Sequence, residues 1–441
     1  MARRVLIITY YWPPSGGSGV QRWLKTVKYL RTFGWEPVVY TAEGGEVPVL
    51  DDSLARDVPQ GVEVIKKTIW EPYSIYKKII GQKKEQRINT GFLSETAKPR
   101  LAEKISVWIR GNFFIPDARC FWIKPSVSFL SGYLKKNPVD AIISTGPPHS
   151  MHLIALGLKD TFGLPWLADF RDPWTTIDFY DQLMLSSWAD AKHKRQEKAV
   201  LKAADEVVTV SWNWADDFKK ILDRRVQVIT NGFDEDDFKE EAGEPDAGFL
   251  FHHIGAMNKD RNPHNFWKAL AELCKTNEGF KAALKIKLTG KNDYSVVQSI
   301  RDNGLEGNVQ YIDYMNHSDV IRSLRKSPIL LLPLNDTPNT LGIIPGKLFE
   351  YLAARRPIFV IGNTGGDTAK IIRETKAGRV AGFEDYESTK KMILDFYEDF
   401  RKGSLKAEDE GLIGNYSRKK CTGQFAALLD KMTKSKTVVT V

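Results

Sequence analysis

Two side chains that could hold a nucleotide, Lys347 and Glu350, lie one helical turn apart in the segment 345–357. The apolar runs 329–334 and 358–361 flank this segment and predict buried strands on either side of a short helix. In an open α/β sheet, ligands collect beyond the carboxyl ends of such strands. The segment is therefore a candidate nucleotide site.

The start of the expected helix favours an anion. Gly346 follows Pro345 there, so the free backbone N–H groups can hold a phosphate, and Lys347 can neutralise it. The carboxylate of Glu350 can accept hydrogen bonds from the two vicinal hydroxyls of a ribose. In the alternative interpretation, Lys347 and Glu350 form only an exposed ion pair on a surface helix.

A glycine-rich turn near the beginning of the chain is a second candidate site. Gly16, Gly17 and Gly19 follow the apolar run 5–11 and precede a helix expected from Val20. Glycines let a backbone approach a phosphate or a sugar closely, and the helix N-terminus behind them favours negative charge. The spacing differs from the dinucleotide-binding fingerprint, so a purely structural turn is the alternative.

The elements that position these residues alternate between strands and helices. Apolar runs predict strands at 5–11, 37–40, 141–144, 165–168 and 206–210, and then at 249–254, 284–288, 309–312, 329–334 and 358–361. This alternation predicts an α/β fold with parallel sheets covered by helices on both faces. An acidic stretch at 234–246 separates the two series, so we expect two Rossmann-like domains facing across a cleft.

The composition is that of an ordinary globular protein, with 42% hydrophobic and 27% charged residues among 441. The cysteines Cys120, Cys274 and Cys421 lie far apart and lack metal-ligand spacing, which indicates a reducing compartment and no disulfide framework or zinc site. No signal peptide is visible, and no apolar stretch approaches the roughly 18 residues that span a bilayer. We therefore expect a cytoplasmic protein.

Most of the net charge of +9 comes from one window, residues 66–124, which has thirteen Lys and Arg against five Asp and Glu. Aromatic residues are frequent in the window, and Leu101, Ile105, Trp108 and Ile109 fall at helical spacing. A basic amphipathic helix is typical of contact with an anionic membrane surface. A core-facing stripe with a solvated basic face is the alternative. Nucleic acid is a weaker one, because no nucleic-acid module is recognisable.

Five segments of the chain resemble, in order, those of GT-B glycosyltransferases, and the resemblance covers nearly the whole sequence. They are 13–22, 144–150, 168–174, 230–234 and 345–357. The chain is most similar to the retaining, family-four type that builds bacterial surface polysaccharides.

This resemblance implies an organisation for the chain. Residues 1–220 would receive a saccharide or lipid-linked acceptor, and residues 221–414 would bind a nucleotide-sugar donor. A helix at 415–433 would cross back to the first domain. The resemblance implies neither a metal ion nor a cofactor.

The resemblance also implies roles for single residues. Gly16, Gly17 and Gly19 would approach the donor phosphates or sugar, and Glu350 would hold the ribose. Arg261 falls where the family usually has its phosphate-binding lysine, and an arginine can grip two phosphate oxygens at once.

Two positions depart from the family pattern. Ala256 replaces the usual arginine of the phosphate loop, so Lys347 or Lys259 is expected to supply that charge. Gly342 stands eight positions before Glu350, where the family has a glutamate that contacts the transferred sugar. The identity of the sugar is therefore open.

His149 resembles the histidine that lies near the donor sugar in such enzymes, where it can contact a hydroxyl or steady developing positive charge. His152 lies three residues further on, on the same helical face. For both residues, a satisfied structural histidine is the alternative.

Charged residues gather directly after the run 165–168. Asp169, Arg171 and Asp172 lie where charges are costly to bury unless they are paired or used. Either aspartate could position the acceptor hydroxyl or take its proton, whereas an internal Arg171 bridge would only structure the loop. Trp174 could present a flat face to the acceptor or could pack in the core.

Together these features predict a glycosyltransferase with a membrane-bound acceptor. Two alternatives remain open: an enzyme of the same fold that modifies a nucleotide sugar, such as a 2-epimerase, and a non-catalytic nucleotide-binding scaffold. The nucleotide base, the sugar, the acceptor and the oligomeric state do not follow from the sequence.

Overall fold

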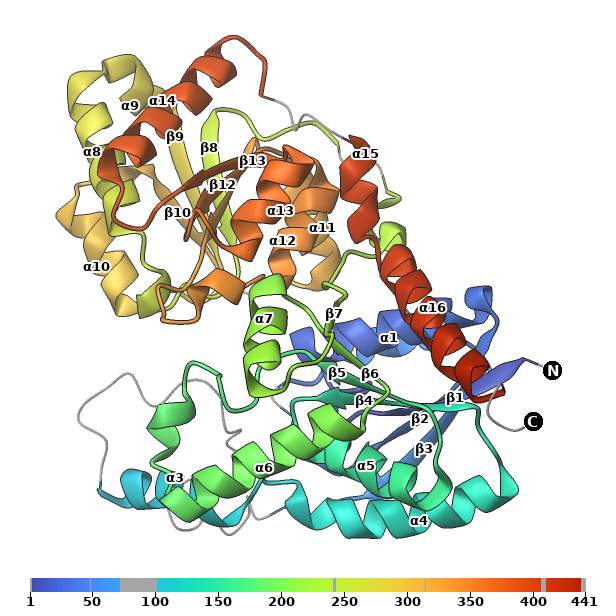
Figure 1. The fold of residues 1–441 in the computed structure, drawn as a ribbon. Coiled ribbons are helices and arrows are strands. Elements are labelled where there is room, and N and C mark those ends of the chain that lie inside the picture. Colours follow the sequence, from blue (N-terminus) through green and yellow to red (C-terminus); the bar gives the residue numbers. More distant parts are fainter. Residues whose placement is uncertain are drawn as a thin grey trace. The chain divides into compact units, whose positions relative to one another are not determined.

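The computed structural model divides the chain into two compact units, each with one parallel sheet between helices (Figure 1). The first unit contains Met1–Thr230 and Cys421–Val441, and the second contains Asn231–Lys420. The structure describes residues 2–47, 49–71, 101–240, 243–313, 315–405 and 410–437. The expected α/β fold with two Rossmann-like domains is confirmed.

The sheet of the first unit has seven strands in the order β3-β2-β1-β4-β5-β6-β7, all parallel. Its strands are β1 (Arg3–Ile8), β2 (Trp35–Glu43), β3 (Glu63–Thr68), β4 (Ala141–Gly146), β5 (Trp166–Phe170), β6 (Glu206–Thr209) and β7 (Gln227–Val228). The central strands are fully buried because helices cover both faces of the sheet.

Strand β1 shows how the sequence fills both faces. Leu6 and Ile8 belong to one hydrophobic cluster and Val5 and Ile7 to another, as the period of two in a strand requires. The first cluster includes residues of α4 (Ile123–Lys136), α5 (Ser150–Phe162), α6 (Ser187–Ala203) and α7 (Trp212–Ile221). The second includes residues of α1 (Ser18–Leu30) and α16 (Arg418–Thr437).

The second unit has six parallel strands in the order β10-β9-β8-β11-β12-β13. They are β8 (Phe249–Ile254), β9 (Leu284–Thr289), β10 (Val309–Ile312), β11 (Ile329–Pro333), β12 (Ile358–Ile361) and β13 (Gly378–Ala381). Helices α8 (His264–Thr276), α9 (Glu278–Ala283), α10 (Tyr294–Asp302) and α14 (Tyr386–Arg401) pack into one core cluster with the strands. Helices α11 (His317–Lys326), α12 (Gly346–Ala354) and α13 (Asp367–Thr375) lie on the other face (Figure 1).

The unit boundaries differ from those expected at residues 220 and 414. The first boundary falls after Thr230, because β7 pairs with β6 and so extends the first sheet. The chain returns to the first unit at Cys421, within α16, and the short helix α15 (Glu410–Ile413) belongs to the second unit. Phe425 and Leu429 of α16 are fully buried in the core of the first unit.

The basic window is described only in part, since residues 72–100 lie outside the described ranges. Its later part forms α3 (Leu101–Phe113) and the turn η3 (Cys120–Trp122). None of the described helices has the length and apolar character needed to cross a bilayer.

Candidate functional site

Two predicted cations of the second unit come together at the carboxyl ends of neighbouring strands. Arg261 lies on the turn η6 (Lys259–Arg261) after β8, and Lys347 lies in the first turn of α12 after β11. Because β8 and β11 are adjacent, their following loops meet at the same edge of the sheet.

The Nζ atom of Lys347 is buried and, among the residues that the structure describes, has no hydrogen-bond partner. It lies 2.6 Å from the position that a Cβ on Gly255 would occupy. Burial is the main cause that lowers the pKa of Lys347 to about 7; Arg261 acts in the same direction and Glu350 in the opposite one. An unpaired buried cation is costly, so its presence indicates a site for an anion. The alternative of an exposed ion pair does not describe this lysine.

Arg261 is held in place by the backbone and by one amide. Its Nε donates to Asn335 Oδ1 (2.9 Å), and its Nη1 donates to the carbonyl of Ala256 (2.9 Å). Burial lowers the pKa of the guanidinium, although Tyr351 and Asp260 oppose this effect. Ala256 stands where the family has an arginine. Its backbone carbonyl thus helps to hold the Arg261 guanidinium in place.

Glu350 lies one turn along α12 from Lys347 and is partly buried. Within the part of the chain that the structure describes, no hydrogen bond or ion pair engages its carboxylate. Burial raises the pKa of Glu350, while His317 and Lys347 counteract that shift. Gly346 and Lys259 are both exposed, and the space around a Cβ on Gly346 is open. Two features of the second unit, the start of α12 and the turn η6, therefore carry Lys347, Glu350, Gly346 and Lys259.

His253 is a further residue of this site that the sequence reasoning missed. Its ring is fully buried at the end of β8, and its Nδ1 lies 3.0 Å from the carbonyl of Leu331. Its Nε2 has no hydrogen-bond partner among the described residues. Burial lowers its pKa well below the usual value, and Lys347 and Arg261 act in the same direction. The pair His252-His253 within an apolar run could have pointed to it. Successive side chains of a strand face opposite sides of the sheet, so the two histidines lie on different faces.

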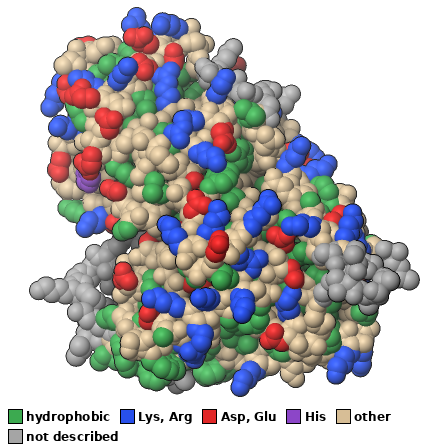
Figure 2. All heavy atoms as spheres, viewed as in Figure 1, with side chains coloured by type: hydrophobic (Ala, Val, Ile, Leu, Met, Phe, Trp, Pro, Cys, Tyr) green, Lys and Arg blue, Asp and Glu red, His purple; other side chains and the backbone are tan. Residues whose placement is uncertain are grey.

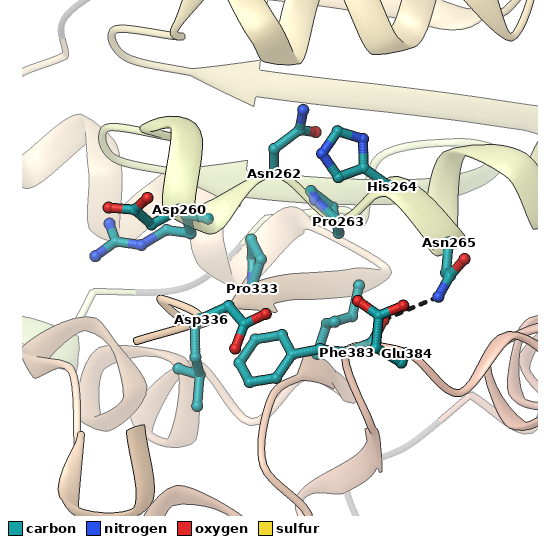
Figure 3. A pocket seen from close by; sticks show the side chains of 12 residues that line it. Asp260, Asn262, Pro263, His264, Asn265, Pro333, Asp336, Phe383 and Glu384 are labelled. Atoms are coloured by element: carbon teal, nitrogen blue, oxygen red, sulfur yellow. Dashed lines mark hydrogen bonds between the residues drawn. The ribbon is translucent and has the colours of Figure 1, made fainter. Parts of the chain in front are cut away.

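A pocket of about 90 Å³ lies beside Arg261, at the ends of β11 and β12 and the start of α8 (Figure 3). Asn265 closes one side of it by donating from Nδ2 to the carbonyl of Phe383 (3.0 Å). Its volume is well below the roughly 300 Å³ of an ordinary small-molecule site, and Lys347 and Glu350 do not line it. We therefore place the candidate nucleotide site at Lys347 rather than in this pocket.

In the first unit, the three loop glycines have different surroundings. A Cβ on Gly16 would lie 2.9 Å from Cβ of Asp51, so this glycine serves internal packing. Gly19 backs onto Arg171, whose Nη1 donates to its carbonyl (2.9 Å). Gly17 has φ of 90° and open space around it, directly before α1. Of the three, Gly17 is the one whose surroundings suit a ligand.

Asp169 is fully buried and its carboxylate is occupied by the protein itself. Arg22 donates to it from Nη2 (2.8 Å) and from Nε, Trp23 donates from Nε1 (2.7 Å), and Thr145 donates from Oγ1 (2.9 Å). Burial favours a higher pKa, but Arg22 and the hydrogen bonds hold the pKa of Asp169 below its usual value. Arg22 also donates to the carbonyls of Thr230 and Ile229 (2.9 and 2.8 Å). The geometry is that of a structural ion pair.

Arg171 connects two loops of the first unit. Besides Gly19, it donates from Nη2 to the carbonyl of Pro147. These two hydrogen bonds fit the loop-structuring alternative that the sequence left open for Arg171. The neighbouring Asp172 is only partly buried, and burial raises its pKa while Arg171 lowers it.

His149 is held between aromatic rings at the start of α5. Its ring stacks on Trp174 with centroids 4.6 Å apart and an interplanar angle of 2°, and it is 8% exposed. The Trp174 indole lies 3.1 Å from Nδ1 of His193 on α6, a residue that the sequence reasoning missed. Burial lowers the pKa of His149 well below its usual value, and His152 adds to the effect. The imidazole is therefore neutral at physiological pH.

The sequence model of the family described as "Glycosyl transferases group 1" matches residues 234–409, which include Arg261, Lys347 and Glu350. These residues form a group 1 glycosyltransferase domain. No match was found among curated protein sequences.

Solved structures resemble this chain over nearly its whole length. Sucrose-phosphate synthase of Thermosynechococcus elongatus is 13% identical with a TM-score of 0.61, covering 98% of this chain and 100% of that chain. HepE of Anabaena, in complex with UDP-glucose, is 13% identical with a TM-score of 0.60, covering 97% and 100%. A point mutant of TarM from S. aureus, in complex with fondaparinux, α-GlcNAc-glycerol and UDP, is 11% identical with a TM-score of 0.58, covering 97% and 100%. These similarities establish the GT-B fold for the whole chain.

Among the described residues of this chain, no three His, Cys, Asp or Glu side chains come together in a way that could hold a metal ion.

Proposed function

We propose that the protein transfers a sugar from a nucleoside diphosphate sugar to a saccharide or lipid-linked acceptor in cell-surface polysaccharide synthesis, with retention at the anomeric carbon. The observation that carries the proposal is the buried, unpaired ammonium of Lys347 beside Arg261 and Gly255. A diphosphate supplies the negative charge that this arrangement lacks. The group 1 family match of the same domain supports a sugar nucleotide as the source of that diphosphate.

Each candidate site residue of the second unit has its own role in donor binding. Lys347 and Arg261 neutralise the diphosphate, which becomes a good leaving group once its charge is balanced. Glu350 accepts hydrogen bonds from the ribose hydroxyls. Gly346 and Lys259, at the exposed helix start and turn, complete the phosphate contacts. In this scheme, charge neutralisation by side chains and helix N-termini takes the place of a metal ion.

Residues of the first unit act on the sugar and on the acceptor. Neutral His149 contacts the donor sugar, and Gly17 lets the loop approach it. Asp172, rather than Asp169, positions the acceptor hydroxyl, because Asp172 is partly accessible and Asp169 is occupied by Arg22, Trp23 and Thr145. A pKa raised by burial makes the Asp172 carboxylate a better proton acceptor.

A panel of nucleoside diphosphate sugars tests the donor assignment. We expect one of them to raise the melting temperature of the protein, and we expect release of the nucleoside diphosphate only when an acceptor is added. UDP-sugars come first, because HepE and TarM were solved with UDP-glucose and UDP. The anomeric configuration of the product, read by NMR, tests retention.

Variants of the two cations make the test specific. Lys347→Met and Arg261→Met should abolish donor stabilisation and turnover, while Lys391→Met, at an exposed lysine of the same unit, should behave as wild type. Wild-type turnover in both cation variants would refute the site. Donor consumption without an acceptor would indicate a nucleotide-sugar-modifying enzyme such as a 2-epimerase. Stabilisation without turnover would indicate a binding scaffold.

A lipid-linked acceptor is supported by exposed aromatic side chains on the first unit. Trp70, Trp108, Phe113 and Phe121 are 56%, 43%, 64% and 50% exposed, and the window that contains them is basic. Figure 2 shows Lys and Arg spread over this unit and hydrophobic side chains along its lower edge. We propose that this surface contacts an anionic membrane from the cytoplasmic side. The three free cysteines are in keeping with that location.

Vesicle sedimentation tests the membrane surface. The protein should bind vesicles rich in phosphatidylglycerol at low salt and bind pure phosphatidylcholine vesicles weakly. Trp108→Ala combined with Phe113→Ala should reduce binding roughly tenfold, because two interfacial aromatic anchors are lost. Tyr294→Ala, at a tyrosine of the second unit that is 75% exposed, is the matched control. Equal binding by the double variant and the control would refute the assigned surface.

A further inference from the structure

His152 is a fully buried histidine of α5 that the proposed reaction does not use directly. Its Nδ1 lies 2.8 Å from Ser144 Oγ, and the Trp166 indole donates to the same Oγ over 2.8 Å. An indole nitrogen can only donate, so Ser144 accepts from Trp166 and has its own hydrogen for His152. Among the described residues the Ser144 hydroxyl has no other acceptor for its hydrogen, so we assign Nδ1 of His152 as that acceptor and place the hydrogen of this neutral ring on Nε2.

Two buried ring nitrogens converge beside Gly146. Neither Nε2 of His152 nor Nδ1 of His149 forms a hydrogen bond within the described structure. They lie 2.6 and 2.9 Å from the position that a Cβ on Gly146 would occupy, and the ring centroids are 5.7 Å apart. Two nitrogens this close to one point can join directly after a small ring rotation, or through one water. Buried polar groups rarely stay unpaired, so the pairing is strongly favoured.

We propose that His152 is a positioning residue, which directs its Nε2 hydrogen at Nδ1 of His149 and thereby fixes His149 in the tautomer that carries hydrogen on Nε2. The chain of groups from Trp166 through Ser144 and His152 thus determines which nitrogen of His149 is a donor.

The tautomer matters because both rings are neutral. Burial lowers the pKa of His149 well below its usual value and that of His152 to about 3. A neutral imidazole can present either an N–H or a lone pair at a given position, and only the N–H can donate a hydrogen bond to a sugar oxygen. Stacking on Trp174 holds the ring plane, but it does not select the tautomer. The catalytic consequence rests on the function proposed above for His149.

Nitrogen NMR of the full-length protein, labelled with ¹⁵N-histidine, tests the proposal without activity. Long-range correlations should show both His149 and His152 with hydrogen on Nε2, with signals assigned through His149→Gln and His152→Gln. In His152→Phe, the two nitrogen shifts of His149 should move toward each other as the tautomers mix. Ser144→Ala, a smaller change, should produce the same mixing by releasing His152. An unchanged single tautomer of His149 in a folded His152→Phe or Ser144→Ala protein would overturn the proposal.

Kinetics separate positioning from mere structural support. His152→Phe should lower kcat by roughly tenfold or more with little change in donor KM, as expected for an outer residue that orients a reacting one. His152→Gln retains an N–H donor and should recover most of the loss. If His149→Gln leaves turnover intact, the role proposed for His149 fails, whereas the NMR result still decides the role of His152. Equal defects in the Phe and Gln variants would also count against positioning.

Discussion

Replacing Asp169 with asparagine should destabilise the first unit rather than disable the chemistry alone. Asp169 is 0% exposed, and the side chain of its partner Arg22 is 1% exposed. The substitution removes the negative charge but leaves the guanidinium buried. Breaking a buried ion pair in this way costs about 3–5 kcal/mol, a large part of the roughly 5–15 kcal/mol that stabilises a domain.

The expected loss can be measured by thermal or denaturant unfolding. For a unit of this size, each kcal/mol corresponds to about 2–4 °C, so Asp169→Asn should lower Tm by roughly 6–20 °C. Glu36→Gln is the matched control, because Glu36 accepts two hydrogen bonds from Arg31 at 2.9 and 2.7 Å but lies at the surface. That exposed pair should contribute less than about 1 kcal/mol.

A double variant isolates the ion pair from the rest of the site. Arg22→Met in the Asp169→Asn background removes the unpaired charge and should restore part of the stability. Restoration stays incomplete because Arg22 also donates to the carbonyls of Thr230 and Ile229. An Asp169→Asn protein with wild-type stability and no turnover would refute this reasoning and would favour the catalytic role.

The same pair has a defined pH dependence. The folded pKa of Asp169 is lower than its unfolded pKa of about 3.9, so the unfolded chain binds the proton more readily. The stabilisation is therefore complete above the unfolded pKa and is lost as the pH falls through the folded value. Acid titration of Tm should show a steeper loss in wild type than in Asp169→Asn.

Three further predictions concern the donor site and its glycines. Because the pKa of Lys347 is lowered to about 7, donor binding at pH 8 should take up roughly one proton. Calorimetry in buffers of different ionisation enthalpy measures this uptake, and Lys347→Met should remove it. Glu350→Gln should weaken donor binding by roughly 10–100-fold, since a hydrogen bond to a charged group is worth about 1.5–3 kcal/mol; an unchanged Kd would exclude the ribose contact. Gly255→Ala should abolish donor binding in a titration, because the new Cβ would lie 2.6 Å from Lys347 Nζ and residue 255 has a φ of 116°. Gly346→Ala is the control: its Cβ would meet open space, so this variant should bind the donor normally.

Most of the fold follows from apolar runs, and the missed strands show why the rest does not. Most of the predicted strands are buried on both faces, so their sequences are almost continuously apolar, whereas β9 and the edge strand β10 keep polar residues at exposed positions. Strands β3, β7 and β13 lie at or near sheet edges and are only partly buried. In β3, Val64 and Ile65 stand beside Lys66 and Lys67, a pattern that resembles a surface loop.

The candidate site could be predicted where strand order alone brings residues together. Lys347 and Arg261 follow β11 and β8, so their proximity follows from the topology of an α/β sheet. The pairing of Arg22 with Asp169 could not be foreseen in this way, because it depends on the direction of a helix side chain across the sheet. The positions of His193 and His253 were likewise set by packing, which leaves little trace in a single sequence.

The passage of α16 from the second unit to the first has a consequence for biosynthesis. Phe425, Leu429 and Met432 fill the first core, and Asp430 accepts from the Trp35 indole (2.8 Å). At about 5–20 residues per second, a ribosome needs on the order of ten seconds or more to make the intervening second unit. During that time the nascent first unit exposes the apolar surface that α16 will cover. We therefore expect a chaperone to bind this surface before α16 has been synthesised.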